Sequence, residues 1–221
     1  MRPATIGPGA DRNAGVQLRY KTGLTSEQYV SQQAWQHASL DRCPWHPAGG
    51  CGFKSHGTYT RIYPPGMKIA RGYCPDEHAT VSMLPDFLAA KLPGTLRDVE
   101  QVIAEVEEAA TVEAAADQLR PDVEMPGRLR WVGRRRRLVY AGLLALRTLM
   151  PDVFADCAAT VGAFRDALGV APVLPVLRAI GAEHLHVLPP PLGFGPRRTV
   201  SLHFMKCQQH SVGARAPPSR A

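Results

Sequence analysis

The sequence predicts an α+β fold in which a small β-hairpin ribbon is followed by a mainly α-helical region and a helical extension. Between residues 43 and 78, short β-prone runs alternate with turns that contain Cys, His and Pro. Beyond residue 94, apolar side chains recur at helical spacing as far as residue 180. Twenty Pro and twenty Gly, gathered at the two ends and between residues 43 and 94, favour small modules joined by turns.

Residues 1–41 are expected to form a flexible arm with one short helix. Residues 1–24 mix Gly, Pro and small polar side chains without periodicity, which predicts a disordered segment. Residues 26–40 are compatible with a short amphipathic helix that has Ser26 as its N-cap, with Tyr29, Val30 and Ala34 on its apolar side.

Residues 42–92 are expected to form the ribbon. Its hairpin consists of strands over residues 58–63 and 67–73, joined by the turn Pro64-Pro65-Gly66.

The pattern of apolar and capping residues over residues 93–150 predicts three helices. The first begins at a capping box formed by Thr95 and Asp98, and a short second helix follows Thr111 and ends near Pro121. The third is expected over residues 128–150, where Pro151 ends it. A helical extension over residues 151–188 follows, with helices at 153–168 and 172–180, and residues 189–221 are expected to be a disordered tail.

Charge and composition indicate a polyanionic partner. The formal net charge is +7 and the isoelectric point is about 9.4, carried mainly by Arg. Arg-rich coding in a GC-rich bacterial genome is the alternative explanation. No stretch approaches the roughly 20 apolar residues that span a bilayer, and residues 1–13 lack a signal-type apolar segment, so we expect a cytoplasmic protein without membrane contact. Five Cys in a reducing compartment favour metal ligation over disulfides.

Two clusters of soft ligands flank the expected hairpin, and they indicate a structural Zn²⁺ site. Zinc in such a site takes four thiolate or imidazole ligands in a tetrahedron, two from each turn of a ribbon. Residues with suitable side chains outnumber the four places, and the choice between His46 and Cys51 stays open; His56 is a weaker candidate. The alternative is that these are ordinary buried Cys and surface His. The five candidate ligands are Cys43, His46, Cys51, Cys74 and His78.

The third predicted helix carries a dense group of arginines in its first turns. A short second helix and a turn before it suggest a helix-turn-helix motif, whose last helix enters the major groove of double-stranded DNA. Arginine in this position suits contacts with phosphates and guanine edges. A solvated basic face is the alternative. The six candidate DNA-binding residues are Arg128, Arg130, Arg134, Arg135, Arg136 and Arg137.

Residues 42–140 resemble the zinc-ribbon and helix-turn-helix region at the start of bacterial insertion-sequence transposases, and related short uncharacterised bacterial zinc-ribbon proteins. The resemblance rests on Cys43-Pro44, on the run His56-Gly57-Thr58-Tyr59-Thr60-Arg61, on Gly72-Tyr73-Cys74-Pro75 and on an apolar exit at residues 79–85. It implies DNA binding linked to mobile genetic elements. The sequence departs from the pattern by placing His at expected Cys positions and by inserting residues 47–50 in the first turn.

The resulting hypothesis is a non-catalytic DNA-binding protein related to mobile elements: an accessory or regulatory factor, or a transposase remnant. Nothing after residue 150 predicts the acidic sheet that strand transfer needs, and Asp76 and Glu77 beside the expected zinc site have no evident pocket. We therefore do not expect an enzyme. The alternative is a zinc-ribbon module that binds protein and not nucleic acid.

Overall fold

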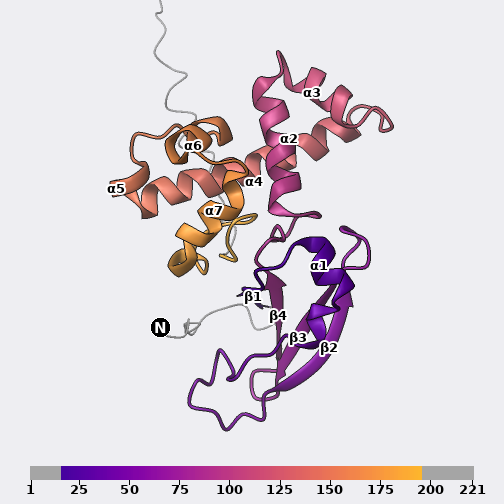
Figure 1. The fold of residues 1–221 in the computed structure, drawn as a ribbon, viewed down its shortest axis with the longest axis vertical. Helices are drawn as coiled ribbons and strands as arrows, with labels where there is room; N and C mark the ends of the chain where they lie inside the picture. The colour runs from indigo at the N-terminus through magenta and orange to yellow at the C-terminus, as the bar shows by residue number, and fades with distance from the viewer. Residues whose placement is uncertain (1–15, 196–221) are drawn as a thin grey trace, which may run out of the picture.

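The computed structural model describes residues 16–195, which form a four-stranded sheet with a group of helices at one end of it (Figure 1). Strands β2, β3 and β4 are antiparallel neighbours, and β1 pairs with β4 in parallel; the order is β1-β4-β3-β2. The strand bounds are β1 (Val16–Tyr20), β2 (Lys54–Thr60), β3 (Lys68–Cys74) and β4 (Ala79–Pro85). The expected α+β fold, with a β-hairpin region followed by helices, is confirmed.

Strand β1 lies in the segment that we expected to be a flexible arm, and that expectation is wrong for residues 16–20. Val16 pairs with Val81 and Tyr20 with Pro85, so the partner strand lies more than sixty positions away in the chain. Five residues without a neighbouring hairpin give no local signal of such a pairing. The part of the predicted arm at residues 1–15 lies outside the described residues.

One face of the sheet is covered by helix α1 (Ser26–Ser31) and the 3₁₀ helix η1 (Ala34–Gln36). They replace the single helix expected over residues 26–40, because Gln33 adopts a left-handed conformation (φ 51°) between them. Thr25, and not Ser26, is the N-cap: it forms a capping box with Gln28. Tyr29 is buried against apolar side chains of the sheet and of the segment after β4, a core completed by Ala34, Met67, Ile69, Leu84, Leu88 and Ala90.

The three helices expected over residues 93–150 are present. The capping box predicted at the start of the first is observed: the Thr95 N–H donates to Asp98 at 2.7 Å, and the Asp98 N–H donates to the Thr95 hydroxyl at 3.0 Å. Pro151 follows the third helix and begins a further short one. The helices are α2 (Leu96–Glu108), α3 (Val112–Leu119), α4 (Gly127–Leu149), α5 (Pro151–Phe154), α6 (Val161–Leu168) and α7 (Val173–Ile180), followed by the 3₁₀ helix η2 (Ala182–His184).

The predicted helix over residues 153–168 is two helices, α5 and α6, and the helical extension shares one core with α2 and α4. Two carboxylates of α2 bind the starts of α6 and α7, the last two α-helices of this extension. Glu107 accepts the N–H groups of Val161 and Gly162 at the start of α6 (2.8 and 2.9 Å), and Glu100 does the same at the start of α7. Each carboxylate thereby satisfies helix N–H groups that have no partner within their own helix.

The predicted disordered tail is ordered over residues 189–195, and the expectation is wrong there. Leu192 is fully buried in the helical core, because Arg178 of α7 fixes the segment: its guanidinium donates to the carbonyls of Leu192 (2.7 Å) and Pro191. The remainder of that predicted tail, residues 196–221, lies outside the described residues.

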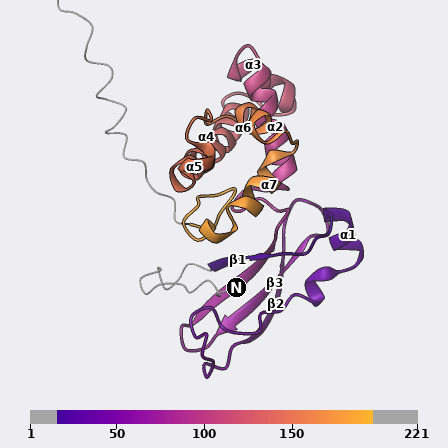
Figure 2. The same ribbon diagram turned by 60° about the vertical axis from the view of Figure 1, so that its left-hand side comes forward.

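The linker between sheet and helices, residues 86–95, is held from both sides. Arg178 donates to the carbonyls of Asp86 (3.0 Å) and Leu88 from the helical side. Arg61, at the end of β2, donates to the carbonyl of Ala89 (3.2 Å) from the sheet side. Figure 2 shows the helices seated on the same end of the sheet from a second direction. None of the helices within residues 16–195 has the length and apolar character needed to cross a bilayer.

Candidate metal centre

Four of the five predicted ligands meet at the end of the sheet that points away from the helices (Figure 1). Cys43, His46 and Cys51 come from the loop between η1 and β2, and Cys74 is the last residue of β3. Their ligand atoms all lie within 4.8 Å of one another. We refer to these four residues as the Cys3His cluster.

The distances within the Cys3His cluster match those of a tetrahedral metal site. The His46 Nδ1 atom lies 3.6 Å from the Cys43 Sγ atom and 3.4 Å from the Cys74 Sγ atom. Metal–sulfur bonds of about 2.3 Å and metal–nitrogen bonds of about 2.0 Å at tetrahedral angles require a sulfur–nitrogen distance of about 3.5 Å. The cluster can therefore hold a metal ion and is compatible with zinc.

The loop before β2 brings three ligands together by turning sharply. The N–H of Gly49 donates to the carbonyl of His46 at 2.9 Å, which closes a turn directly after the second ligand. Gly49 and Gly50 have φ values of 89° and 91°, a conformation that side chains disfavour. The chain thereby returns toward the sheet in time to place Cys51 beside the other ligands.

Aromatic side chains shield the cluster from water. Its three Cys are buried, and Trp45 and Phe53 pack against them. The Phe53 ring lies directly over Gly72 of β3: a Cβ atom at position 72 would lie 2.3 Å from the ring. Glycine at this position is therefore required for the aromatic cover of the site.

The metal-free site holds at least one thiol in its neutral form. Burial, together with hydrogen bonding to the other two cluster cysteines, raises the pKa of Cys74 to about 11, against an opposing hydrogen bond from the backbone of Glu77. A metal ion binds the thiolate, so binding must displace the proton. On its other side, the His46 ring directs its Nε2 atom to a Glu77 carboxylate oxygen at 3.8 Å, an arrangement in which a carboxylate orients a metal-binding imidazole.

The sequence left open whether His46 or Cys51 is a ligand, and the structure places both in the Cys3His cluster. The fifth predicted ligand, His78, lies outside the cluster. His78 has a left-handed backbone (φ 48°), and its Nδ1 atom lies 3.3 Å from the Tyr73 hydroxyl. The weaker candidate, His56, packs against the Tyr73 ring, with centroids 5.2 Å apart and the ring planes tilted by 32°. The prediction of His78 as a ligand is wrong because sequence spacing does not reveal where this turn directs its side chain.

The six predicted DNA-binding arginines do not share one surface. Arg135 is buried, with its guanidinium 3.6 Å from the centroid of the Trp131 ring. Burial lowers the pKa of Arg135 to about 10. Arg128 forms an ion pair with Asp117 at 2.6 Å, and Arg136 is half-buried. The structure thus removes Arg135 from the candidate DNA contacts, and Arg128 is already paired within the protein.

The remaining three, Arg130, Arg134 and Arg137, are exposed on one side of α4. At 100° per residue they lie within an arc of about 60°. Within residues 16–195, none of the three forms an ion pair with a carboxylate. We refer to these three residues as the arginine stripe.

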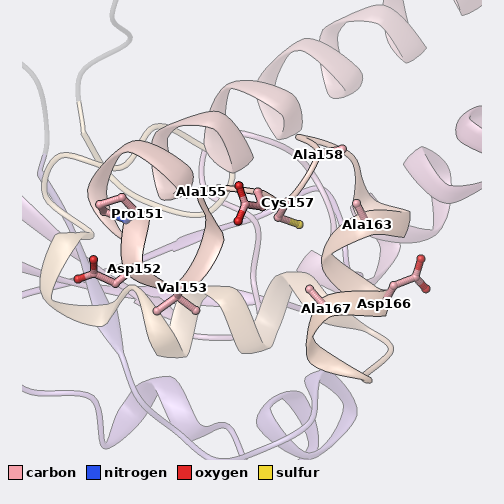
Figure 3. Close-up of a pocket in the computed structure, with 10 residues that line it drawn as sticks. Pro151, Asp152, Val153, Ala155, Cys157, Ala158, Ala163, Asp166 and Ala167 are labelled. Atoms are coloured by element: carbon pink, nitrogen blue, oxygen red, sulfur yellow. The ribbon is translucent and has the colours of Figure 1, made fainter.

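A cavity of about 460 Å³ lies beside α5 and α6. Figure 3 shows the Asp152 and Asp166 carboxylates at opposite ends of the lining, pointing away from each other. Burial raises the pKa of Cys157, the cysteine in this lining, so its thiol stays neutral near pH 7. The lining residues include three carboxylates, those of Asp152, Asp156 and Asp166, and no His.

Comparisons of this chain with protein-family models, with curated proteins and with solved structures find no match.

Proposed function

We propose that this protein is a non-catalytic DNA-binding protein, stabilised by one structural Zn²⁺ ion and contacting double-stranded DNA through α4. The observation that carries the proposal is the arginine stripe: three exposed guanidinium groups on one helix side without an acidic partner in the described residues. Such groups neutralise phosphates and release counterions on binding. A link to mobile genetic elements, as an accessory or regulatory factor or a transposase remnant, rests on the sequence resemblance.

Zinc is the metal that this donor set favours. Three thiolates and one imidazole are soft to borderline ligands, and they fill all four places of a tetrahedron. A filled, shielded coordination sphere leaves no open place for a water molecule or substrate. The metal therefore stabilises the loop before β2 against the end of β3 and takes no part in a reaction.

The contact proposed here differs in one respect from a helix-turn-helix. Seven residues, 120–126, separate α3 from α4, whereas the turn of that motif has about three to four. We therefore assign DNA contact to the exposed side of α4 and attach no role in the groove to α3.

Metal content of the purified protein tests the zinc site. We expect about one zinc per chain in the wild type, and its loss in Cys51→Ser and in His46→Asn. His78→Asn is the matched control, because it removes an imidazole of the same ribbon that lies outside the Cys3His cluster, and it should keep the metal. Wild-type protein that is folded and contains no zinc would refute this part of the proposal.

Salt-dependent binding of a labelled duplex tests DNA contact. Replacing all three residues of the arginine stripe with Ala should reduce the slope of log Kd against log salt by roughly 2.7, since each phosphate contact contributes about 0.9. The control removes three exposed cations from the sheet region instead, Lys21, Arg42 and Lys54, and should leave the slope near the wild-type value. Equal slopes in the two triple variants would show that the stripe is not the contact.

A zinc-loaded protein without affinity for any duplex would favour the alternative function, a zinc-ribbon module that binds protein.

A further inference from the structure

The turn between β2 and β3 presents an apolar side chain almost completely to solvent. Ile62 is 97% exposed and Tyr63 is 47% exposed. Exposed single apolar residues are common, but an isoleucine without cover at the tip of a turn adds unfavourable contact with water. The cations near this turn indicate which kind of partner contacts Ile62.

The turn is held in place by hydrogen bonds at both ends. The Arg61 N–H donates to the Met67 carbonyl at 2.9 Å, and the Arg61 guanidinium donates to the linker carbonyls of Ala89 and Leu92. The N–H of Gly94 donates to the Tyr63 carbonyl at 3.3 Å. Ile62 therefore extends from a braced turn, and ordering it on a partner costs little conformational entropy.

The same linker connects this turn to the arginine stripe. Arg134 donates to the carbonyl of Lys91 at 3.4 Å, and Lys91 lies between the linker residues that hold the turn. Lys91 itself is exposed. The linker therefore places Arg134, the middle residue of the arginine stripe, and the exposed Lys91 near the turn that carries Ile62.

We propose that Ile62 is an apolar wedge that enters the minor groove of duplex DNA while the arginine stripe and Lys91 bind the adjacent phosphates. This inference rests on the proposed function and adds a second contact from the sheet. Proteins of many folds insert one apolar side chain between base steps, which bends the duplex and increases the bound surface. Insertion into a lipid surface requires a broad apolar face, and here the projection consists of Ile62 and part of Tyr63.

Binding and bending of a duplex labelled at both ends test the wedge. Ile62→Ser should weaken Kd about tenfold, which corresponds to ~1.4 kcal/mol, and should reduce the bending seen by energy transfer. The salt slope should stay at the wild-type value, because no cation is removed. The matched control is Val153→Ser, a 57% exposed apolar residue on α5, which should bind and bend DNA as the wild type does.

The outcomes separate this inference from the proposed function. Duplex binding by the wild type, with Ile62→Ser equal to it in affinity and bending, would overturn the wedge and leave the α4 contact intact. Loss of affinity in Ile62→Ser accompanied by a lower salt slope would also overturn it, because the substitution would then act on the cations. A wild type that binds vesicles of anionic lipid and no duplex would overturn both.

Discussion

Glu100 of α2 offers a direct test of how the helical region is held together. Its carboxylate is fully buried and accepts three hydrogen bonds: from the N–H groups of Val173 (2.8 Å) and Leu174 (2.7 Å) and from the Arg165 guanidinium (2.8 Å). Helix α7 has no side-chain cap of its own at this end. Glu100→Gln changes no volume but turns one acceptor into a donor and removes the charge.

The expected loss of stability follows from these contacts. One backbone N–H then faces an amide NH₂ and loses its partner, which costs about 1–3 kcal/mol. The charge-assisted bond to Arg165 is lost or weakened, at about 1.5–3 kcal/mol. Arg165 is about 29% exposed and regains water, so we take the lower part of the combined range. The free energy of unfolding should fall by about 3 kcal/mol, in line with the cost of removing one partner of a buried ion pair.

Urea unfolding followed by circular dichroism measures this change. With a slope of about 2 kcal/mol per molar, the midpoint should fall by about 1.5 M. Glu108→Gln on the same helix is the control; Glu108 is exposed, and its substitution should change the free energy by no more than about 0.5 kcal/mol. A midpoint for Glu100→Gln within roughly 0.3 M of the wild type would refute the capping argument.

Three further predictions concern the metal site and α4. Because the pKa of the Cys74 thiol lies near 11 in the metal-free protein, metal binding at lower pH must release its proton. The zinc Kd, measured by chelator competition, should therefore rise at least about tenfold for each unit by which the pH falls. A Kd that is constant from pH 8 to pH 6 would contradict this. Gly72→Ala drives a Cβ atom into the Phe53 ring and should cost about 1–3 kcal/mol, whereas Gly133→Ala, in open space on α4, should stabilise by up to about 1 kcal/mol. A melting temperature of Gly72→Ala equal to or above that of the wild type would show that the clash is relieved. Trp131→Ala removes the ring that packs against the apolar cluster of Val106, Ala115, Ala116 and Val132, and it should destabilise by roughly 3 kcal/mol in the same melts. An unchanged midpoint would mean that the ring is dispensable.

Features governed by neighbouring residues could be predicted from the sequence. The capping box of Thr95, the break at Pro151 and the Cys-Pro turns each depend on a few adjacent side chains, and the structure contains all of them. The four residues of the Cys3His cluster were among the five predicted ligands for the same reason, since three of them lie within nine residues.

Features that depend on distant residues could not be predicted. Strand β1 forms only by pairing with β4, and residues 189–195 are ordered because Arg178 binds carbonyls of this segment. The same holds for Arg135, whose place in a run of arginines suggests exposure, while the helix turns it toward Trp131 and the core. At 100° per residue, the arginine stripe and Arg135 lie on different sides of α4. The sequence therefore already allowed Arg135 to be separated from the exposed arginines.

The two arginines that bind the linker, Arg61 and Arg178, affect where a protease can separate the sheet from the helices. A chain that passes from a small sheet to a helical bundle usually offers proteases an accessible strand at the crossing. Here Arg61 and Arg178 occupy carbonyls along that crossing, and Leu88 and Ala89 are fully buried. Limited digestion should therefore spare residues 86–90. A sheet or a helical bundle taken from another protein would also have to supply an arginine that binds the linker from its own side.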